Sequence, residues 1–135
     1  MKVLYVSSEC APFIKTGGLG DVAGSLPKAL AAKGAEVAVV CPLYSKISHD
    51  WRSKMTFVKS MYVQLAWRNQ YCGIFVYEAD GVKYYFLDNE YYFAGPKPYG
   101  NIYEDIEKFA VFSKAAISAL PSLNFRPDII HCHDW

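Results

Sequence analysis

The sequence predicts an α/β protein in which a parallel sheet carries an inserted antiparallel β-meander. Three observations support this prediction. The first part of the chain reads strand, helix, strand, the pattern of a right-handed parallel crossover. Three strand-like runs follow, and the last two are separated by Asp80-Gly81, a dipeptide typical of a tight hairpin turn. A long stretch with helical periodicity then leads into a further apolar run, as in a second crossover.

The first crossover is the most clearly patterned unit. Residues 3–6 form a short apolar run typical of a buried parallel strand. Residues 19–33 carry apolar side chains at three- and four-residue steps, which predicts an amphipathic helix. Pro27 lies inside this helix, so we expect a kink or a local break there. Gly34 occupies the position of a left-handed residue that ends a helix, and residues 36–41 supply the second buried strand.

The middle of the chain predicts the meander. Residues 57–66, 71–79 and 82–87 are strand-like, whereas residues 47–54 are polar and undecided. Residues 88–100, rich in Tyr, Gly and Pro, predict a long ordered loop, and loops of that length tend to be functional. The many aromatic residues of this half suit the core of a sheet, although aromatics can also line a carbohydrate site by stacking on sugar faces.

A second long helix is expected to begin after Asn101. Asn101 can cap it, and Glu104 is placed to reach back as in a capping box. We expect Pro121 to stop the helix and residues 129–132 to form another buried strand. The buried stripe of this helix is expected to comprise Ile102, Ile106, Phe109, Ala110, Ser113, Ala116, Ile117 and Leu120.

Composition removes several classes of protein from consideration. A chain of 135 residues fits one domain and can build a core without disulfides or metal. The formal net charge is +1 and no run of Lys or Arg occurs, so nucleic acid is not an expected partner. No apolar stretch has membrane-spanning length, and the run after Lys2 is too short for a signal-peptide core.

The cysteines indicate a reducing compartment. They lie far apart, without a C-x-x-C pair or a spacing typical of a zinc site, and we expect all of them to be free thiols. Together with the missing membrane and signal segments, this predicts a cytoplasmic protein without a membrane partner. The four cysteines are Cys10, Cys41, Cys72 and Cys132.

Residues 15–22, Lys-Thr-Gly-Gly-Leu-Gly-Asp-Val, lie where the loop after the first strand enters the first helix. Gly17 and Gly18 lack a Cβ, so the backbone can take φ > 0 and let an anion approach the unpaired amides of the first helical turn. Lys15 adds a positive charge. The pattern predicts a phosphate or carboxylate site, with a simple packing turn as the alternative. Asp21 fits a site role or a favourable interaction with the helix dipole.

Two other nucleotide-binding motifs match poorly. Residues 18–23 fit G-x-G-x-x-A, but about ten residues separate Ser7 from Gly18, where a dinucleotide-binding turn should be tight. The second strand also ends in Cys41-Pro42, where that fold places an acidic residue. A phosphate-binding loop of the Gly-Lys-Ser/Thr type is excluded because the lysine precedes the glycines.

Ligands of open parallel sheets bind beyond the carboxyl ends of the strands. The glycine loop, the loop that contains Tyr99, and His133-Asp134 should meet there. His131 and His133 share one side of the last strand, with Cys132 opposite. We expect His133 either to donate a hydrogen bond to a ligand or to cap the strand end. No third ligand accompanies His131 and His133, so we expect neither a metal ion nor another cofactor.

Residues 3–22 closely resemble the amino terminus of bacterial glycogen synthases and plant starch synthases. They read Val-Leu-Tyr-Val-Ser-Ser-Glu-Cys-Ala-Pro-Phe-Ile-Lys-Thr-Gly-Gly-Leu-Gly-Asp-Val. The resemblance continues through Leu-Pro-Lys-Ala-Leu at 26–30, Pro-Leu-Tyr at 42–44 and Pro-Asp-Ile-Ile-His-Cys-His-Asp-Trp at 127–135. It therefore spans the whole chain.

The resemblance implies a retaining glucosyltransferase of the GT-B class, with two Rossmann-like domains facing each other across a cleft. Such enzymes move glucose from ADP-glucose or UDP-glucose to the nonreducing end of an α-1,4-glucan without a metal ion. Residues 1–135 would be part of the N-terminal, acceptor-side domain. The nucleotide-binding C-terminal domain would be missing, so we expect the chain alone to be inactive and to belong to a longer enzyme.

The resemblance also implies roles for single residues. Lys15 and the amides of Gly17 and Gly18 would contact the donor phosphates, and His133 would lie against the transferred glucose. Tyr99 matches a tyrosine linked to substrate, and Asp21 matches the aspartate of the signature. Two alternatives stay open: a glucan-binding or interaction module without chemistry, and a dinucleotide-binding domain.

Overall fold

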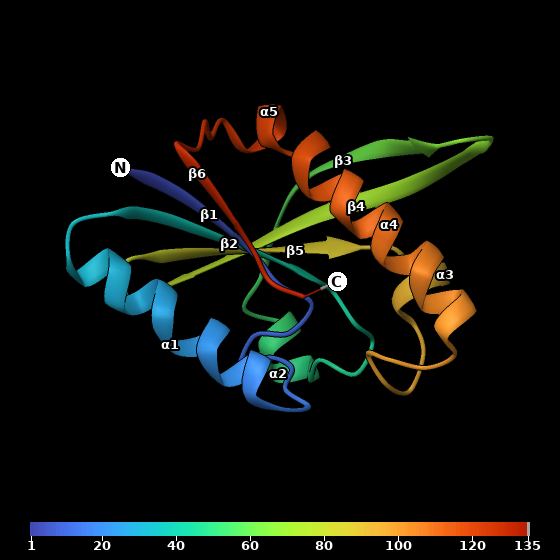
Figure 1. Ribbon diagram of the computed structural model, residues 1–135, viewed down its shortest axis with the longest axis horizontal. Helices are drawn as coiled ribbons and strands as arrows, with labels where there is room; N and C mark the ends of the chain where they lie inside the picture. The colour runs from blue at the N-terminus through green and yellow to red at the C-terminus, as the bar shows by residue number, and fades with distance from the viewer. Residues whose placement is uncertain (135) are drawn as a thin grey trace.

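Six strands form a single mixed sheet in the computed structural model, which describes residues 1–134 (Figure 1). Their order is β3-β4-β5-β2-β1-β6. Strands β1, β2, β5 and β6 pair in parallel, whereas β3, β4 and β5 pair antiparallel, so the predicted parallel sheet with a meander is confirmed. The elements are β1 Lys2–Val6, α1 Gly18–Ala32, β2 Glu36–Pro42, α2 His49–Arg52, β3 Thr56–Leu65, β4 Arg68–Ala79, β5 Val82–Asp88, α3 Glu90–Phe93, α4 Ile102–Ser118, α5 Leu120–Leu123 and β6 Ile129–Cys132.

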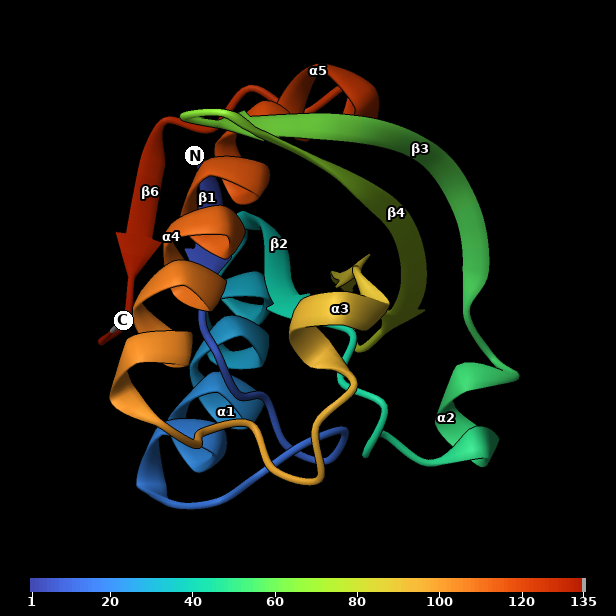
Figure 2. The ribbon, with the colours of Figure 1, turned by 90° about the vertical axis from the view of Figure 1, so that its right-hand side faces the viewer.

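Helices α1 and α4 lie on opposite faces of the sheet (Figures 1 and 2). On the α1 face, Phe13 fills the space beside the meander, with its ring 5.1 Å from Tyr84 and 5.0 Å from Phe86 between centroids. Trp51 of α2 closes the same cluster, 4.8 Å from Phe13. The polar segment that the sequence left undecided therefore contains a short helix that holds this tryptophan against the core.

The hairpin between β4 and β5 has the turn that its sequence predicts. Asp80 and Gly81 both have positive φ, 53° and 75°, as a type I′ turn requires. Strand β5 then pairs antiparallel with β4 on one side and parallel with β2 on the other. The meander is thus joined to the parallel part of the sheet by β5.

Helix α1 runs without interruption through Pro27, so the expected break does not occur. A proline has no N–H to donate to the carbonyl four residues before it, which here is that of Ala23. The thiol of Cys10 lies 3.4 Å from that carbonyl oxygen and donates to it. Burial raises the pKa of Cys10 to about 12, which keeps the donor proton in place. Gly34 has a φ of 96°, as expected of the residue that ends the helix.

Two predictions around α4 were wrong in detail. The segment 88–100 includes the short helix α3, so it is not a loop throughout. Asn101 caps α4 by accepting from the amide of Tyr103 at 2.8 Å, but the carboxylate that reaches back is Asp105, not Glu104. Asp105 accepts from the amide of Gly100 at 3.0 Å. Helix α4 ends at Ser118, and Pro121 lies in the first turn of α5.

The buried stripe of α4 is also rotated from the predicted one. Phe109 and Ala116 are buried as expected, but Ile102, Ile106 and Ile117 are about half exposed. The stripe that faces the core includes two charged side chains, Asp105 and Lys108, and a pattern based on apolarity alone passes over them. The buried residues of α4 are Asp105, Lys108, Phe109, Val111, Phe112, Ala115 and Ala116.

Strand β6 is an edge strand, paired only with β1 within the described residues. Ile129 and Ile130 are therefore 44% and 42% exposed, and the expectation of a buried strand was wrong here. The four cysteines are free thiols, with Cys132 exposed and the other three buried. No helix within residues 1–134 is both long enough and apolar enough to span a bilayer. Trp135, the last residue of the closing motif, lies outside the described residues.

Candidate functional site at the carboxyl ends of the parallel strands

The segments that leave β1, β5 and β6 reach the same edge of the sheet. The hydroxyl of Tyr99, in the loop before α4, donates to Glu9 and is hydrogen-bonded to the hydroxyl of Ser8, so it joins this loop to the loop after β1. The segment after β6 runs beside the end of β1, where the amide of His133 donates to the carbonyl of Val6 at 3.1 Å. The sequence therefore located the edge at which its candidate residues lie.

Glu9 is the centre of the glycine loop, although sequence reasoning did not single it out. Its side chain is buried, and its two oxygens accept from the amide and the hydroxyl of Thr16, both at 2.7 Å. The amide of Gly17 and the hydroxyl of Tyr99 also donate to it, at 3.3 Å and 2.5 Å. Burial acts to raise the pKa of Glu9, but these hydrogen bonds outweigh it and the pKa is lowered.

The contact with Glu9 occupies one of the amides that were expected to bind an anion. The amide of Gly17, which the resemblance assigns to donor phosphates, is used by a carboxylate of the chain itself. Gly17 has a φ of −164°, which any residue adopts, so the expected positive φ is not used. A Cβ added at Gly17 or at Gly18 would meet no atom within 4 Å. These two glycines therefore face open space at the start of α1, and packing does not require them.

Lys15 and Asp21 form an ion pair across the first turn of α1. The ammonium lies 2.9 Å from a carboxylate oxygen, and both side chains are about half exposed. Gly20 makes this arrangement possible, since a Cβ there would lie 3.1 Å from the stem of Lys15 and 3.2 Å from Glu9. The lysine is thus held beside the open start of the helix, with its charge accessible from solvent.

Tyr99 is half-buried and belongs to a hydrogen-bond network that links three segments. Its hydroxyl contacts Glu9 and lies 2.7 Å from the hydroxyl of Ser8. Burial, together with the hydrogen bond to Glu9, raises the pKa of Tyr99 well above its usual range. Tyr44, which follows β2, donates to the carbonyl of Ser8 at 2.8 Å. A buried Ser-Glu pair directly after the first strand was the sequence signal that could have identified this network.

The imidazole of His133 lies beside two other rings. Its imidazole is stacked on Tyr5, with centroids 4.2 Å apart, and lies 4.3 Å from His131. Burial and the neighbouring His131 lower the pKa of His133, so the imidazole is neutral near pH 7. Two buried atoms, Nε2 of His133 and the hydroxyl of Tyr5, have no hydrogen-bond partner within residues 1–134. Cys132, which lies between the two histidines in the sequence, is exposed.

No group of three or more His, Cys, Asp or Glu side chains within residues 1–134 is arranged to hold a metal ion. The polar atoms that the site offers are an ammonium, backbone amides at the start of a helix, and a neutral imidazole. This set is suited to an anionic group next to a polyhydroxyl group, because the first two attract negative charge and the third exchanges hydrogen bonds with hydroxyls.

A second buried network lies behind Tyr99. Lys108 donates to the carbonyl of Pro98 at 2.8 Å and pairs with Asp105 at 3.3 Å. This pair fixes the loop before α4 to the helix, so the position of Tyr99 depends on it. Asp105 and Lys108 belong to the otherwise apolar buried face of α4. In the sequence, only their spacing of three residues could have indicated that they pair.

The sequence model of the family described as the starch synthase catalytic domain matches residues 2–135. The chain belongs to this family. The resemblance seen in the glycine loop and in the closing motif is thereby confirmed over the whole chain.

Curated relatives in the starch synthase family carry the name glycogen synthase. The chain is 57% identical to that of Lachnoclostridium phytofermentans over 99% of its own length, and 59% identical to that of Lachnospira eligens over 98%. It is 53% identical to the glycogen synthase of Geobacillus stearothermophilus over 100% of its length. In each case it spans 28% of the relative.

A solved structure in the starch synthase family has the same fold. The catalytic domain of starch synthase IV from Arabidopsis thaliana, bound to ADP and acarbose, superposes with a TM-score of 0.87 at 31% identity. The match covers 98% of this chain and 28% of that one.

Proposed function

We propose that residues 1–135 are part of the N-terminal, acceptor-side domain of a retaining glucosyltransferase of the GT-B class. The complete enzyme moves glucose from a sugar nucleotide to the nonreducing end of an α-1,4-glucan in the cytoplasm. The observation that carries the proposal is the open start of α1 with Lys15 beside it, at the edge where His133 lies. The nucleotide-binding C-terminal domain lies outside this chain, which spans 28% of its glycogen synthase relatives.

The phosphate role belongs to Lys15 and to the amide of Gly18. Departure of a nucleoside diphosphate builds negative charge on its phosphates, and a fixed ammonium with helix-start amides stabilises that charge where it develops. Asp21 holds Lys15 in place until a phosphate competes for it. The amide of Gly17 donates to Glu9 and thereby fixes the conformation of the loop. It can contact a phosphate of the sugar nucleotide only when Glu9 releases it.

The sugar role belongs to His133 and Tyr99. The buried Nε2 of His133 supplies a hydrogen-bonding group that the described chain leaves unpaired, and a hydroxyl of the transferred glucose is a fitting partner. Holding the sugar in this way brings the acceptor and the leaving group to one face. Tyr99 acts as a positioning residue, since its hydroxyl is engaged with Glu9 and Ser8.

ADP-glucose is the first donor to test, because the starch synthase IV structure was obtained with ADP. In the full-length protein, Lys15→Ala should lower turnover with ADP-glucose by about tenfold or more, since loss of a charged phosphate contact costs about 1.5–3 kcal/mol. Lys15→Met keeps the apolar stem and should behave alike. Lys33→Ala, an exposed lysine at the far end of α1, is the matched control. Equal turnover in all variants would contradict the phosphate role of Lys15. The same assays with UDP-glucose identify which nucleotide base the enzyme prefers.

A further inference from the structure

Strand β3 lies at one edge of the sheet, and within residues 1–134 its only strand neighbour is β4. In Figure 2 it follows the outer margin of the sheet. After a bulge between Phe57 and Lys59, residues 59–65 pair with β4 in an unbroken antiparallel register. An edge strand of this kind directs the amide and carbonyl groups of alternate residues away from its neighbour. The regular part of β3, residues 59–65, therefore offers a straight backbone edge to another strand.

The side chains of β3 do little to protect this edge. Charged residues, proline and bulges are the features that usually keep an edge strand from pairing. The single charge of β3 is on Lys59, the strand contains no proline, and its bulge lies before the regular part. Tyr62, in the middle of the regular part, is 68% exposed. Val63 is buried, so Tyr62 points to the opposite face, where its ring lies 6.2 Å from that of Tyr71 on β4.

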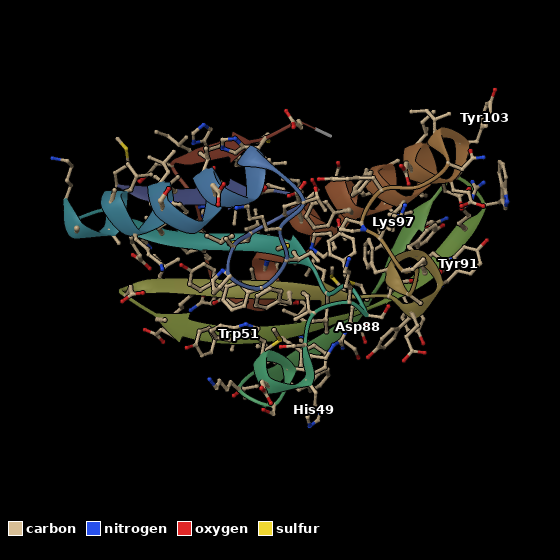
Figure 3. The ribbon with its side chains drawn as sticks, turned by 90° about the horizontal axis from the view of Figure 1, so that it is seen from below. His49, Trp51, Asp88, Tyr91, Lys97 and Tyr103 are labelled. Atoms are coloured by element: carbon tan, nitrogen blue, oxygen red, sulfur yellow. The ribbon has the colours of Figure 1, made fainter. Side chains whose placement is uncertain are left out.

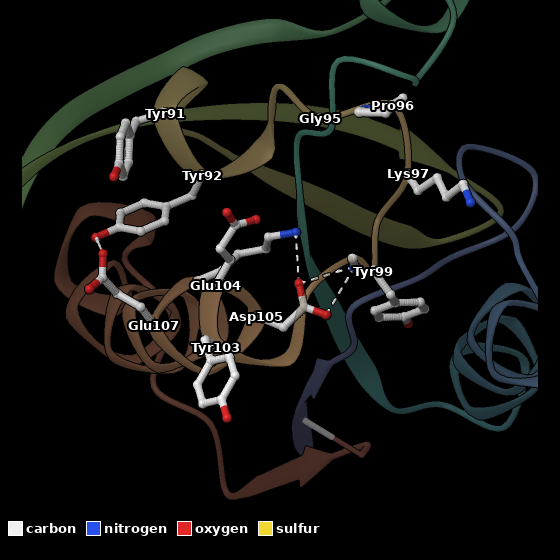
Figure 4. Close-up of a pocket in the computed structure, with 12 residues that line it drawn as sticks. Tyr91, Tyr92, Gly95, Pro96, Lys97, Tyr99, Tyr103, Glu104, Asp105 and Glu107 are labelled. Atoms are coloured by element: carbon white, nitrogen blue, oxygen red, sulfur yellow. Dashed lines mark hydrogen bonds and ion pairs between the residues drawn. The ribbon is translucent and has the colours of Figure 1, made fainter.

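Other exposed tyrosines have different surroundings. Tyr91 and Tyr103 border the opening between α3 and α4 (Figure 4), and both lie at one end of the molecule (Figure 3). These two residues belong to helices, whose backbone groups are largely used within the helix itself. Tyr62 differs from them because its exposed ring is next to backbone groups that can pair with a further strand. A strand is therefore the kind of partner that fits at β3.

The regular part of β3 is complementary to itself in the antiparallel direction. It reads Lys-Ser-Met-Tyr-Val-Gln-Leu. When two copies are centred on Tyr62, the two Tyr62 rings meet on the two-fold axis. Ser60 of each copy then faces Gln64 of the other, and Met61 faces Val63. Polar side chains thus meet polar ones and apolar side chains meet apolar ones, which is the pairing that stabilises a sheet.

The charges also suit this pairing. In the register centred on Tyr62, the two Lys59 side chains lie at opposite ends of the paired segment. Each faces Leu65 of the other copy, on which its apolar stem can pack. Like charges therefore do not oppose each other, although they would do so if two copies were centred on Lys59.

We propose that β3 pairs with β3 of a second copy of this chain, antiparallel and two-fold about Tyr62. The two sheets become one continuous sheet. Because both copies use the same edge, the contact closes as a dimer and leaves no further β3 edge to extend it. Strand β6, which leads to His133, forms the opposite edge of the sheet, so the proposed transfer site stays open. Dimerisation does not depend on the proposed reaction.

Sedimentation velocity of the full-length protein over a series of concentrations measures the dimer. Tyr62→Glu places two carboxylates face to face on the axis, so the dissociation constant should rise about tenfold or more. Tyr103→Glu is the matched control, because Tyr103 is 81% exposed on α4, and it should dimerise like the parent protein. Thermal unfolding of the same samples shows whether each variant is folded.

Cysteine cross-linking tests the register and does not need the dimer to be disrupted. The background is Cys132→Ser, because Cys132 is an exposed thiol. Directly opposed residues of an antiparallel pair have Cβ atoms about 4.5–5.5 Å apart, within reach of a short thiol cross-linker. Tyr62→Cys should therefore cross-link to itself. Ser60→Cys and Gln64→Cys should cross-link when they are mixed and not when either is alone.

Several outcomes would overturn this dimer. One is a parent protein that stays monomeric at every concentration, and another is a dimer that Tyr62→Glu leaves intact. A monomer that Tyr62→Glu destabilises would show that another segment of the same enzyme covers β3, which also overturns the proposal. Cross-linking of Ser60→Cys alone that equals cross-linking of the mixture would contradict the two-fold pairing about Tyr62.

Discussion

The imidazole of His133 is stacked on the ring of Tyr5, with the two planes 22° from parallel. The two residues belong to neighbouring parallel strands of the sheet, β1 and the extension of β6. Tyr5 is fully buried, so it can act on a bound sugar only through His133. This contact gives a way to change the electrostatics of His133 while leaving the ligand's other partners in place.

Replacing Tyr5 should change the pKa of His133 in a way that depends on the ring. Burial lowers this pKa below the usual value, and His131 adds to the effect. Tyr5→Leu removes the stacked ring and admits water, so the pKa should rise, with protonation beginning at higher pH. Tyr5→Phe keeps the stack and should keep the low pKa. NMR titration of the His133 ring proton measures both, and equal pKa values in the two variants would contradict the role of the ring.

Glu9 should make the fold sensitive to acid. A carboxyl whose pKa is lowered by folding stabilises the protein fully above its unfolded pKa and loses that contribution as pH falls through the folded value. The free energy of unfolding should therefore decrease as the pH drops below about 4.5, the ordinary value. Glu9→Gln should cost about 1–3 kcal/mol at pH 7 and remove this part of the dependence.

Denaturant unfolding at a series of pH values measures the effect of Glu9. Glu36→Gln, at the exposed start of β2, is the control, and it should keep the acid dependence of the parent protein. If Glu9→Gln lost stability in acid as steeply as the parent, the lowered pKa of Glu9 could not be its source.

Alanine substitutions at four glycines should distinguish residues needed for folding from residues needed at the donor site. Gly24→Ala would bring a Cβ within 2.8 Å of the Ala11 carbonyl, and Gly20→Ala would press on Lys15, so each should cost about 1–3 kcal/mol in unfolding free energy. Gly17→Ala and Gly18→Ala meet open space and should change stability by less than about 0.5 kcal/mol.

The same glycine variants test the donor site. In the proposed enzyme, Gly18→Ala places a methyl group where the phosphates approach, so KM for ADP-glucose should rise although the fold is intact. Thermal unfolding and steady-state kinetics on one preparation give both quantities. A stable Gly18→Ala variant with unchanged KM would mean that nothing approaches the start of α1.

Cys10 and Pro27 should be energetically coupled. The Cys10 thiol donates to the Ala23 carbonyl that Pro27 leaves without its helical partner. Cys10→Ala should destabilise the protein by about 1–3 kcal/mol. In a Pro27→Ala background the new amide can reach that carbonyl, so the same substitution should cost about 1 kcal/mol less. A double-mutant cycle of chemical denaturation measures the difference, and strictly additive costs would rule the coupling out.

The sequence predicted the architecture well because strand and turn signals here are local. The type I′ turn needs only Asp80-Gly81, and the first crossover is visible in the change from a continuous apolar run to apolar residues at three- and four-residue steps. It predicted α4 less well. Ile102 and Ile106 are more apolar than Asp105 and Lys108, yet the charged pair is buried, because each charge compensates the other. Single-residue hydrophobicity cannot show such compensation.

The sequence predicted where the candidate site lies, but not which residues contact one another in it. Lys15, Asp21, Tyr99 and His133 lie at the edge where parallel strands end, as expected. Glu9 was not identified, because its role comes from four donors that only the folded loop brings to one carboxylate. Roles of this kind depend on contacts between segments far apart in the chain, and no spacing in the sequence records them.

The pairing of β1 with β6 has a consequence for synthesis on the ribosome. The two strands come from the beginning and from the far end of these residues, and the amide of Lys2 is also held by Asp128 at 2.7 Å. The local meander can form while the chain is still emerging, but the Tyr5–His133 stack cannot exist until β6 has left the exit tunnel. Until then the ring of Tyr5 lacks the stacking partner that covers it in the folded protein.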